Sequence, residues 1–129
     1  MAVIGTPYGE LKGKAMKIEK SSNISKSLVK ADGAKDVAIR WLISKADGAE
    51  NFALRLFELQ PGGFTPLHIH PHEHEVFVIE GQGIFVYQGQ QHPFAAEYVI
   101  FVPGNKQHQF KNTGDSVLRM LCIIPTTAA

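Results

Sequence analysis

From Asp36 onward the sequence consists of short β-rich runs interrupted by turn residues, with no convincing amphipathic helix between them. β-Branched and aromatic residues fill the runs, whereas Gly, Pro, Asn and Asp cluster between them, as in strands joined by tight turns. Strands that recur at this spacing predict an all-β sandwich or barrel. We expect strands over residues 37–44, 52–60, 68–70, 76–79, 84–87, 98–102, 109–111 and 117–124.

Three groups of turn-forming residues mark where strands are expected to end. Asp47-Gly48 is a strong turn pair, because glycine reaches positive φ without steric cost. Pro61-Gly62-Gly63 is expected to stop the second run, since proline cannot donate to a strand ladder. The stretch Gln90-Gln91-His92-Pro93 is expected to be an exposed loop, which would place His92 in solvent.

Residues 1–35 differ from the rest of the chain because they hold many Lys and Ser residues and few large apolar ones. We interpret them as a solvated or partly ordered extension that precedes a domain of residues 36–129. The alternative is that Met16-Lys17-Ile18 or Ser27-Leu28-Val29 adds an edge strand, either to this barrel or as an arm on a partner subunit. A chain of 129 residues is otherwise the length of one domain.

Charge and composition narrow the class of partner. The net charge of +1 gives no electrostatic reason to expect nucleic acid or an anionic membrane. The longest uncharged apolar runs, such as residues 120–125, are far shorter than the ~20 residues that a membrane helix needs. One cysteine cannot form an internal disulfide, and the first residues show no signal-peptide pattern, so we expect a cytoplasmic protein.

The most informative chemistry lies in a histidine-rich tract. Four of the six histidines fall within residues 68–74. Imidazole is the commonest protein ligand for transition metals, and at pH 7 most of it is neutral and able to bind. Alternate residues of a strand share a face, so His68 and His70 are expected to point the same way. The tract therefore indicates a metal site.

Further ligands are specified less directly. Pro71 bends the chain out of the regular strand, so alternation does not fix the direction of the side chains that follow it. On return to a strand, His74, Glu75 or, less favourably, His72 would supply a third ligand. His108 begins a later strand after a tight turn, where ligands distant in sequence converge in β-barrels, and it is expected to join them.

Two spaced motifs resemble those of the cupin superfamily, over roughly residues 52–125. In the first motif, a glycine is followed after five residues by His-x-His and later by a closing glycine. These positions match Gly62, His68, His70 and Gly81. In the second motif, a Pro-x-Gly turn precedes a histidine and an asparagine. The corresponding residues are Pro103, Asn105, His108 and Asn112.

The chain departs from these motifs at particular positions. Where cupins usually carry a glutamate ligand, three residues after His70 and six before the closing glycine, this chain has His74. Glu75 satisfies a four-residue gap from His70 but leaves only five residues before that glycine, so counting from both ends favours His74. Glu97 and Asn105 replace two glycines of the second motif, and Asn105 also tolerates left-handed backbone.

The resemblance implies a double-stranded β-helix, or jelly-roll barrel, formed by residues 36–129. The histidine pattern is similar to that of a subgroup of small single-domain bacterial cupins that bind one divalent metal ion through four histidines, with no single reaction established among them. Such sites suit Mn, Fe, Zn or Ni, and small cupins of this kind form homodimers. The implied metal ligands are His68, His70, His74 and His108.

Four neutral ligands would leave the metal ion with its full formal charge, which favours an anionic or enolate-like substrate. The resemblance implies an enzyme that acts on a small molecule by dioxygenase, isomerase or lyase chemistry. The alternative is a non-catalytic metal-containing protein that binds or senses a small ligand. No general base is identified, and the remaining candidates for that role are Glu75, Tyr87 and Tyr98.

Three other residues have competing interpretations. For Arg55, which lies in an expected strand, an outward-facing ion pair is favoured over a clamp for a substrate carboxylate. Cys122 is interpreted as a small buried hydrophobe. His72 is expected to lie in solvent or beside a metal ligand rather than to be one.

Overall fold

The computed structural model describes residues 15–128. Within that range the chain forms nine strands and three short 3-10 turns, so the prediction of an all-β fold is confirmed. The 3-10 turns are η1 (Ser21–Asn23), η2 (Lys45–Asp47) and η3 (Thr126–Ala128). The strands are β1 (Ser27–Leu28), β2 (Lys35–Ile43), β3 (Phe52–Phe64), β4 (His74–Glu80), β5 (Gln82–Tyr87), β6 (Gln90–Ala95), β7 (Val99–Val102), β8 (His108–Asn112) and β9 (Leu118–Pro125).

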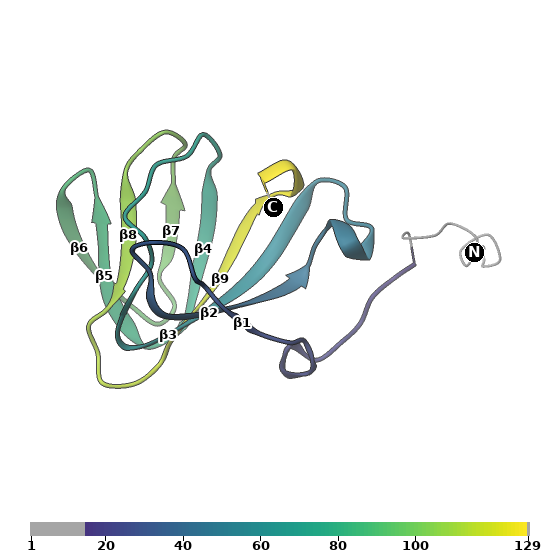
Figure 1. The fold of residues 1–129 in the computed structure, drawn as a ribbon, viewed down its shortest axis with the longest axis horizontal. Helices are drawn as coiled ribbons and strands as arrows, with labels where there is room; N and C mark the ends of the chain where they lie inside the picture. The colour runs from purple at the N-terminus through teal and green to yellow at the C-terminus, as the bar shows by residue number, and fades with distance from the viewer. Residues whose placement is uncertain (1–14, 129) are drawn as a thin grey trace.

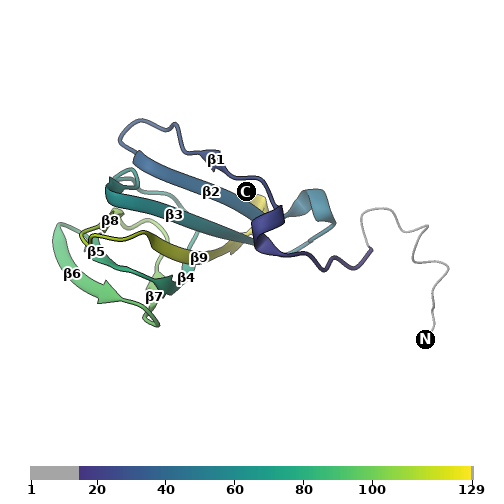
Figure 2. The same ribbon diagram turned by 90° about the horizontal axis from the view of Figure 1, so that it is seen from below.

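The strands form one curled antiparallel sheet. Its order is β6-β5-β8-β3-β9-β4-β7, with β2 paired to β3 and β1 paired to β2 (Figure 1). The 13-residue strand β3 joins the two walls, because it pairs with β9 up to Leu59 and then reaches β8 through Phe64. Seen from below, β2 and β3 lie on one side of the fold and β4 and β7 on the other (Figure 2).

Strand β3 continues through the segment that was expected to end it. The pairing of β2 with β3 jumps from Val37↔Leu59 to Lys35↔Phe64, which leaves residues 60–63 as a bulge. Gly62 has a φ of 82°, and a Cβ at Gly63 would lie 2.8 Å from the carbonyl oxygen of Lys35. The prediction of a stop at residues 61–63 was wrong, because Pro and Gly here interrupt the ladder without ending the strand.

Strand alternation builds the core and also orients the site. In β4 the side chains at positions 74, 76 and 78 are buried and those at 75 and 77 are exposed. In β8 the buried positions are 108, 110 and 112. His74 and His108 therefore lie on the inward faces of strands whose next inward residues belong to the core. That core includes Leu59, Val76, Val78, Phe85, Phe110, Leu118, Met120 and Ile124.

One strand lies where a loop was expected. Residues 90–95 form β6, which pairs with β5 along its whole length, so His92 is exposed as expected but lies in a strand. Only Phe94 of this strand is buried. Because most of β6 faces solvent, and Pro93 is tolerated at a sheet edge, its sequence carries little of the hydrophobic signal that marks the other strands.

The described part of the N-terminal extension contacts the barrel of its own chain. Ser27 and Leu28 pair with Ile39 and Ala38 of β2, and the amide of Val29 donates to the carbonyl of Val37. Residues 16–18 form no strand. Residues 1–14, which belong to the same expected extension, lie outside the described residues. Within residues 15–128, no helix is long and apolar enough to cross a membrane.

The amide of Asn112 supports the turn between β8 and β9 and provides a test of the fold. Its Nδ2 donates to the carbonyls of Leu59 and Ser116 at 2.9 Å each, and its Oδ1 accepts from the amide of Gly114. Asn112→Ala should lower the free energy of unfolding by about 1–3 kcal/mol in urea titrations, because these buried groups lose their partner. The exposed neighbour variant Thr113→Ala should change it by less than about 0.5 kcal/mol. Equal effects of the two would contradict this role.

Candidate metal centre

The strand expected over residues 68–70 is absent, and the prediction was wrong there: a single backbone bridge at His68 joins the histidine tract to the distant strand β8. The amide of His68 donates to the carbonyl of His108 at 3.1 Å, and the amide of His108 donates back at 3.0 Å. Nearby, the amide of Asn105 donates to the carbonyl of His70 at 2.7 Å. Asn105 has a φ of 62°, in the left-handed region that the sequence suggested. The turn before β8 thus holds His68 and His70 of the histidine tract next to His108.

The histidine side chains converge in two overlapping groups. The ligand atoms of His68, His70 and His108 lie within 4.8 Å of one another, and so do those of His70, His72 and His74. His70 belongs to both groups, and its Nε2 lies 2.8 Å from the Nε2 of His74. The four histidines expected as ligands are therefore neighbours, with His72 close beside them.

Hydrogen bonds to carbonyl groups determine which ring nitrogen of His70 and of His108 carries the proton and which has a lone pair. The Nδ1 of His108 lies 2.8 Å from the carbonyl oxygen of Lys106, and the Nδ1 of His70 lies 2.9 Å from that of His72. A carbonyl oxygen only accepts, so each Nδ1 carries the proton and each neutral ring has a lone pair on Nε2. The Nε2 of His108 is buried without a hydrogen-bond partner among the described residues. An orphaned buried lone pair beside other imidazoles fits a divalent metal ion.

His74 contacts a buried thiol instead of a carbonyl. Its Nδ1 lies 3.3 Å from the Sγ of Cys122, and one nitrogen of the Arg55 guanidinium donates to the same sulfur at 2.8 Å. Cys122 is buried, as the sequence suggested, but it also connects a candidate ligand with a cation. Burial raises the pKa of the Cys122 thiol, which keeps this connection neutral on the sulfur side.

Burial keeps the imidazoles in the form that binds metal. Desolvation, with smaller contributions from Arg55 and neighbouring histidines, lowers the pKa of His74 to about 2. Desolvation and the nearby His108 lower the pKa of His68 to about 4. Desolvation also lowers the pKa values of His72 and His108. A neutral ring needs no deprotonation before it binds a cation at pH 7.

His72 lies against the ring of His70. The two rings stack with centroids 3.9 Å apart and planes 3° from parallel. His72 also supplies the carbonyl that accepts from His70, as described above. These contacts hold His70 in one orientation and place His72 beside a candidate ligand, while its own ring belongs to the second group of converging histidines.

A cavity of about 230 Å³ lies next to these histidines, inside the barrel. Among the described residues, no Asp or Glu side chain lines it, and most of its surface is apolar. Arg55 lines it from β3, while Val29 and Ala31 close it from the N-terminal segment, which the sequence had not identified as part of the site. The other lining residues are Val37, Ile39, Phe57, Thr65, Pro66, His68, His74, Val76, His108, Phe110, Met120 and Cys122.

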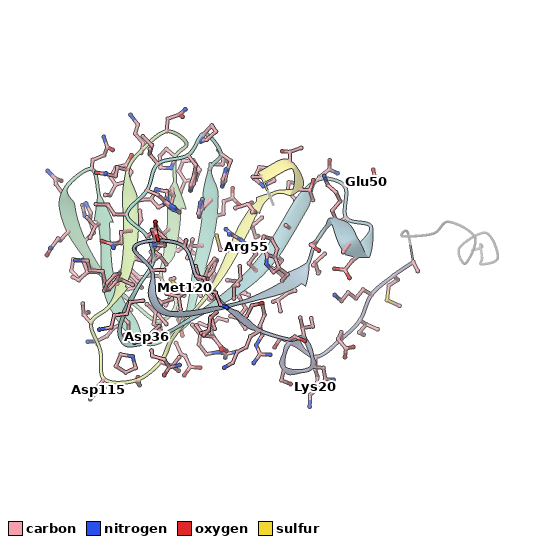
Figure 3. All side chains as sticks on the ribbon, viewed as in Figure 1. Lys20, Asp36, Glu50, Arg55, Asp115 and Met120 are labelled. Carbon is pink, nitrogen blue, oxygen red and sulfur yellow. The ribbon has the colours of Figure 1, made fainter. Side chains whose placement is uncertain are left out.

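Arg55 points into the molecule. Figure 3 labels it near Met120 in the middle of the fold, whereas Lys20, Glu50 and Asp115 lie at the outline. The expectation of an outward-facing ion pair was wrong, because position 55 has the inward phase of β3, opposite Cys122 of β9. Alternation alone did not reveal this orientation, since both faces of β3 carry apolar residues.

The three candidates for a general base lie in different places. Glu75 is on the exposed outer face of β4, opposite in phase to His74. Tyr98 is 53% exposed, and its carbonyl accepts from Val78, away from the His74 end of β4. Tyr87 is partly buried and pairs with His108 in the β5–β8 ladder. Of the three, only Tyr87 lies beside the histidine cluster.

Comparison with known proteins identifies the sequence family of this barrel. Residues 55–124 match the cupin domain family Cupin_2. The chain is 32% identical to the oxalate-binding protein of Thermotoga maritima, over 71% of this chain and 78% of that protein. It is 34% identical to 1-methylthio-D-xylulose 5-phosphate methylsulfurylase of Rhodospirillum rubrum over 55% of this chain, which is 46% of the length of that enzyme.

A solved structure gives the same fold. The polyketide cyclase RemF from Streptomyces resistomycificus superposes with a TM-score of 0.81 at 34% identity, over 86% of this chain and 80% of that one. The jelly-roll barrel expected from the motifs is thereby confirmed. The family match covers the region that carries the histidines, since it begins at Arg55 and ends at Ile124.

The lowered pKa values predict how the metal-free protein responds to acid. An unfolded histidine binds a proton near pH 6.5, whereas folded His68 and His74 resist protonation down to about 4 and about 2. Below pH 6.5 the unfolded chain therefore binds more protons, and stability should fall as the pH decreases from 7.5 to 5. Urea unfolding in the presence of a chelator measures this slope. His68→Asn should reduce it and His92→Asn, at an exposed position, should not; a flat profile would contradict the assignment.

Proposed function

Because this chain belongs to the cupin domain family, we propose that it is a mononuclear divalent-metal enzyme that acts on the carbonyl group of a small molecule inside the barrel. Isomerase or lyase chemistry through an enolate is the form that we favour, and dioxygenase chemistry is the alternative reaction class. The observation that carries the proposal is the buried, unpartnered Nε2 of His108 among convergent imidazoles beside a cavity.

The proposed ligands are His68, His70, His74 and His108, which hold one ion of Mn, Fe, Zn or Ni. Open nitrogen-rich sites suit all four metals, and the imidazole set does not choose among them. His72 supports His70 by stacking and through its carbonyl group. When bound, the ion supplies Lewis acidity that polarises a carbonyl or enolate oxygen.

The residues of the chain supply the rest of the environment. The neutral imidazoles do not cancel the charge of the ion, and the Arg55 guanidinium adds a second positive charge to the same cavity. Apolar walls, including Phe57, Phe110 and Met120, exclude water and so strengthen interactions with these charges. Tyr87 is the candidate for holding or moving a proton at its phenolic oxygen that pairs with His108 in the β5–β8 ladder, although it is not among the residues that line the cavity.

The size of the cavity limits what enters it. About 230 Å³ is less than the ~300–1,000 Å³ of pockets that hold drug-sized ligands, so a small metabolite or one end of a larger molecule fits best. The likeness to an enzyme named as a polyketide cyclase supports the second of these, in which one end of a larger molecule enters the cavity. On this proposal, Val29 and Ala31 cover the bound group.

Non-catalytic ligand binding is the second candidate function. The relative from Thermotoga maritima is named for binding oxalate, and within residues 15–128 no carboxylate side chain lines the cavity to serve as a base. A protein that uses the same ion and Arg55 to retain or sense a small anion would need no base. Turnover separates this function from the first.

We also propose that two copies form a homodimer in the cytoplasm. The outer face of β4, β7 and β9 exposes large apolar side chains, among them Phe77 at 43%, Val99 at 76% and Phe101 at 58%. Glu75 is the single charged residue among those that line the adjoining grooves on this face. An exposed apolar patch of this kind supports association with a second copy.

Turnover and metal content together test the proposed function. Protein purified without an affinity tag should contain close to one divalent ion per chain, and His108→Ala should lose most of it, whereas the exposed control His92→Ala should not. The loaded wild type should convert a 1,3-dicarbonyl such as pentane-2,4-dione or acetoacetate, followed by NMR and by oxygen uptake.

The outcomes distinguish the classes. Conversion without oxygen uptake supports isomerase or lyase chemistry, and stoichiometric uptake with Fe(II) supports the dioxygenase class. Tight binding without turnover under any metal supports the binding protein. Full metal occupancy in His108→Ala would contradict the metal site, on which the isomerase or lyase, the dioxygenase and the binding protein all depend.

A further inference from the structure

Arg55 is a cation that faces a cavity rather than solvent. It lies on β3 opposite Cys122 of β9 and lines the cavity together with His68, His74 and His108. Its Nε is buried and has no hydrogen-bond partner among the described residues. A buried donor without an acceptor is costly, and proteins normally avoid it.

The charge of Arg55 is also uncompensated within residues 15–128. Arg119 pairs with Glu58 at 3.2 Å and with Glu80 at 3.3 Å, and Arg40 approaches Glu58 at 4.0 Å. Arg55 forms no such pair in that part of the chain, and no acidic side chain lines its cavity. A half-buried guanidinium in apolar surroundings is stabilised by an anion that enters the cavity and pairs with it.

Neighbouring side chains hold the guanidinium in place. Its Cζ lies 4.8 Å from the ring centroid of Phe57 and 5.6 Å from that of Trp41. One terminal nitrogen donates to the Sγ of Cys122 at 2.8 Å. Stacking and this single bond fix the plane of the group while most of its five donors remain for a ligand, which is an arrangement suited to a carboxylate.

The cation and the histidine cluster belong to one cavity. Cys122 contacts both Arg55 and His74, so the two are separated by one sulfur atom. The charge of Arg55 also contributes to the lowered pKa values of His68, His72 and His74, which places it within electrostatic reach of the cluster. A small molecule can thus present one polar end to Arg55 and another to the histidines.

We propose that Arg55 binds the carboxylate of the ligand, so that this cavity selects small oxo-carboxylic acids over neutral dicarbonyl compounds. The inference rests on the proposed function for the ketone end of the ligand, which faces the histidine cluster. The carboxylate end depends on Arg55 alone. Acetoacetate fits both requirements, and pentane-2,4-dione is a neutral compound of similar size that lacks the anion.

Isothermal titration of the metal-loaded protein with these two probes under nitrogen tests the proposal, with NMR of the cell contents showing that the probe is unconverted after each run; for a probe that is converted, its KM is compared in place of the Kd. The wild type should bind acetoacetate at least tenfold more tightly than pentane-2,4-dione. Arg55→Gln should weaken acetoacetate binding about tenfold to a hundredfold, the range for a charged hydrogen-bonded pair, and should leave the affinity for pentane-2,4-dione within about twofold. Metal content should be unchanged in this variant.

Two further variants separate the position of the charge from its shape. Arg119→Gln, the same substitution at a cation outside the cavity, should leave the affinities for both probes at their wild-type values. Arg55→Lys keeps the charge but loses the planar fork, and should fall between wild type and Arg55→Gln. If Arg55→Gln does not fold, the wild-type preference for acetoacetate and the Arg55→Lys variant still decide the matter.

The results separate this inference from the proposed function. Equal wild-type affinity for the two probes, binding of neither, or unchanged acetoacetate affinity in Arg55→Gln would overturn the role of Arg55, even if the metal enzyme turns over a neutral dicarbonyl. Acetoacetate binding that persists in metal-depleted His108→Ala and still requires Arg55 would support the carboxylate site while counting against the metal-dependent function.

Discussion

The reciprocal backbone hydrogen bonds between His68 and His108 are the constraint on which the site depends. They tie the tract that follows β3 to the first residue of β8, two segments that are distant in sequence. The left-handed Asn105, whose amide donates to the carbonyl of His70, fixes the turn that leads into this bridge. With the backbones joined, the inward phase of β8 directs the ring of His108 into the barrel, and the rings of His68, His70 and His74 lie beside it.

Desolvation gives the resulting cavity its chemical character. The same burial that stabilises the core lowers the pKa values of His68, His74 and His108, so the rings remain neutral lone-pair donors. Carbonyl groups of the chain, rather than acidic side chains, accept from the Nδ1 atoms of His70 and His108. Of the part of the chain that the structure describes, the Arg55 charge faces the cavity and no negative side chain does, which is an environment that favours an anionic ligand.

Much of this arrangement follows from local sequence pattern, and the rest does not. The alternating apolar pattern predicted the β-fold. The spacing of the two motifs predicted that His68, His70, His74 and His108 lie close together, because that spacing is a local property of the sequence. The orientation of Arg55 was missed, since β3 is apolar on both faces and its phase depends on which neighbours cover it. The bulge at residues 60–63 and the contribution of Val29 to the cavity depend on tertiary pairing, which turn residues and composition do not encode.

Four imidazoles from two separated segments are proposed to bind one ion. X-ray absorption at the cobalt edge, on protein loaded with one equivalent of Co(II), measures the number of imidazole rings around the metal directly. A site of four imidazoles should give a signal from four rings in the wild type and from three, with weakened binding, in His108→Ala. A wild-type spectrum that requires only two rings, or one that His108→Ala leaves unchanged, would contradict it.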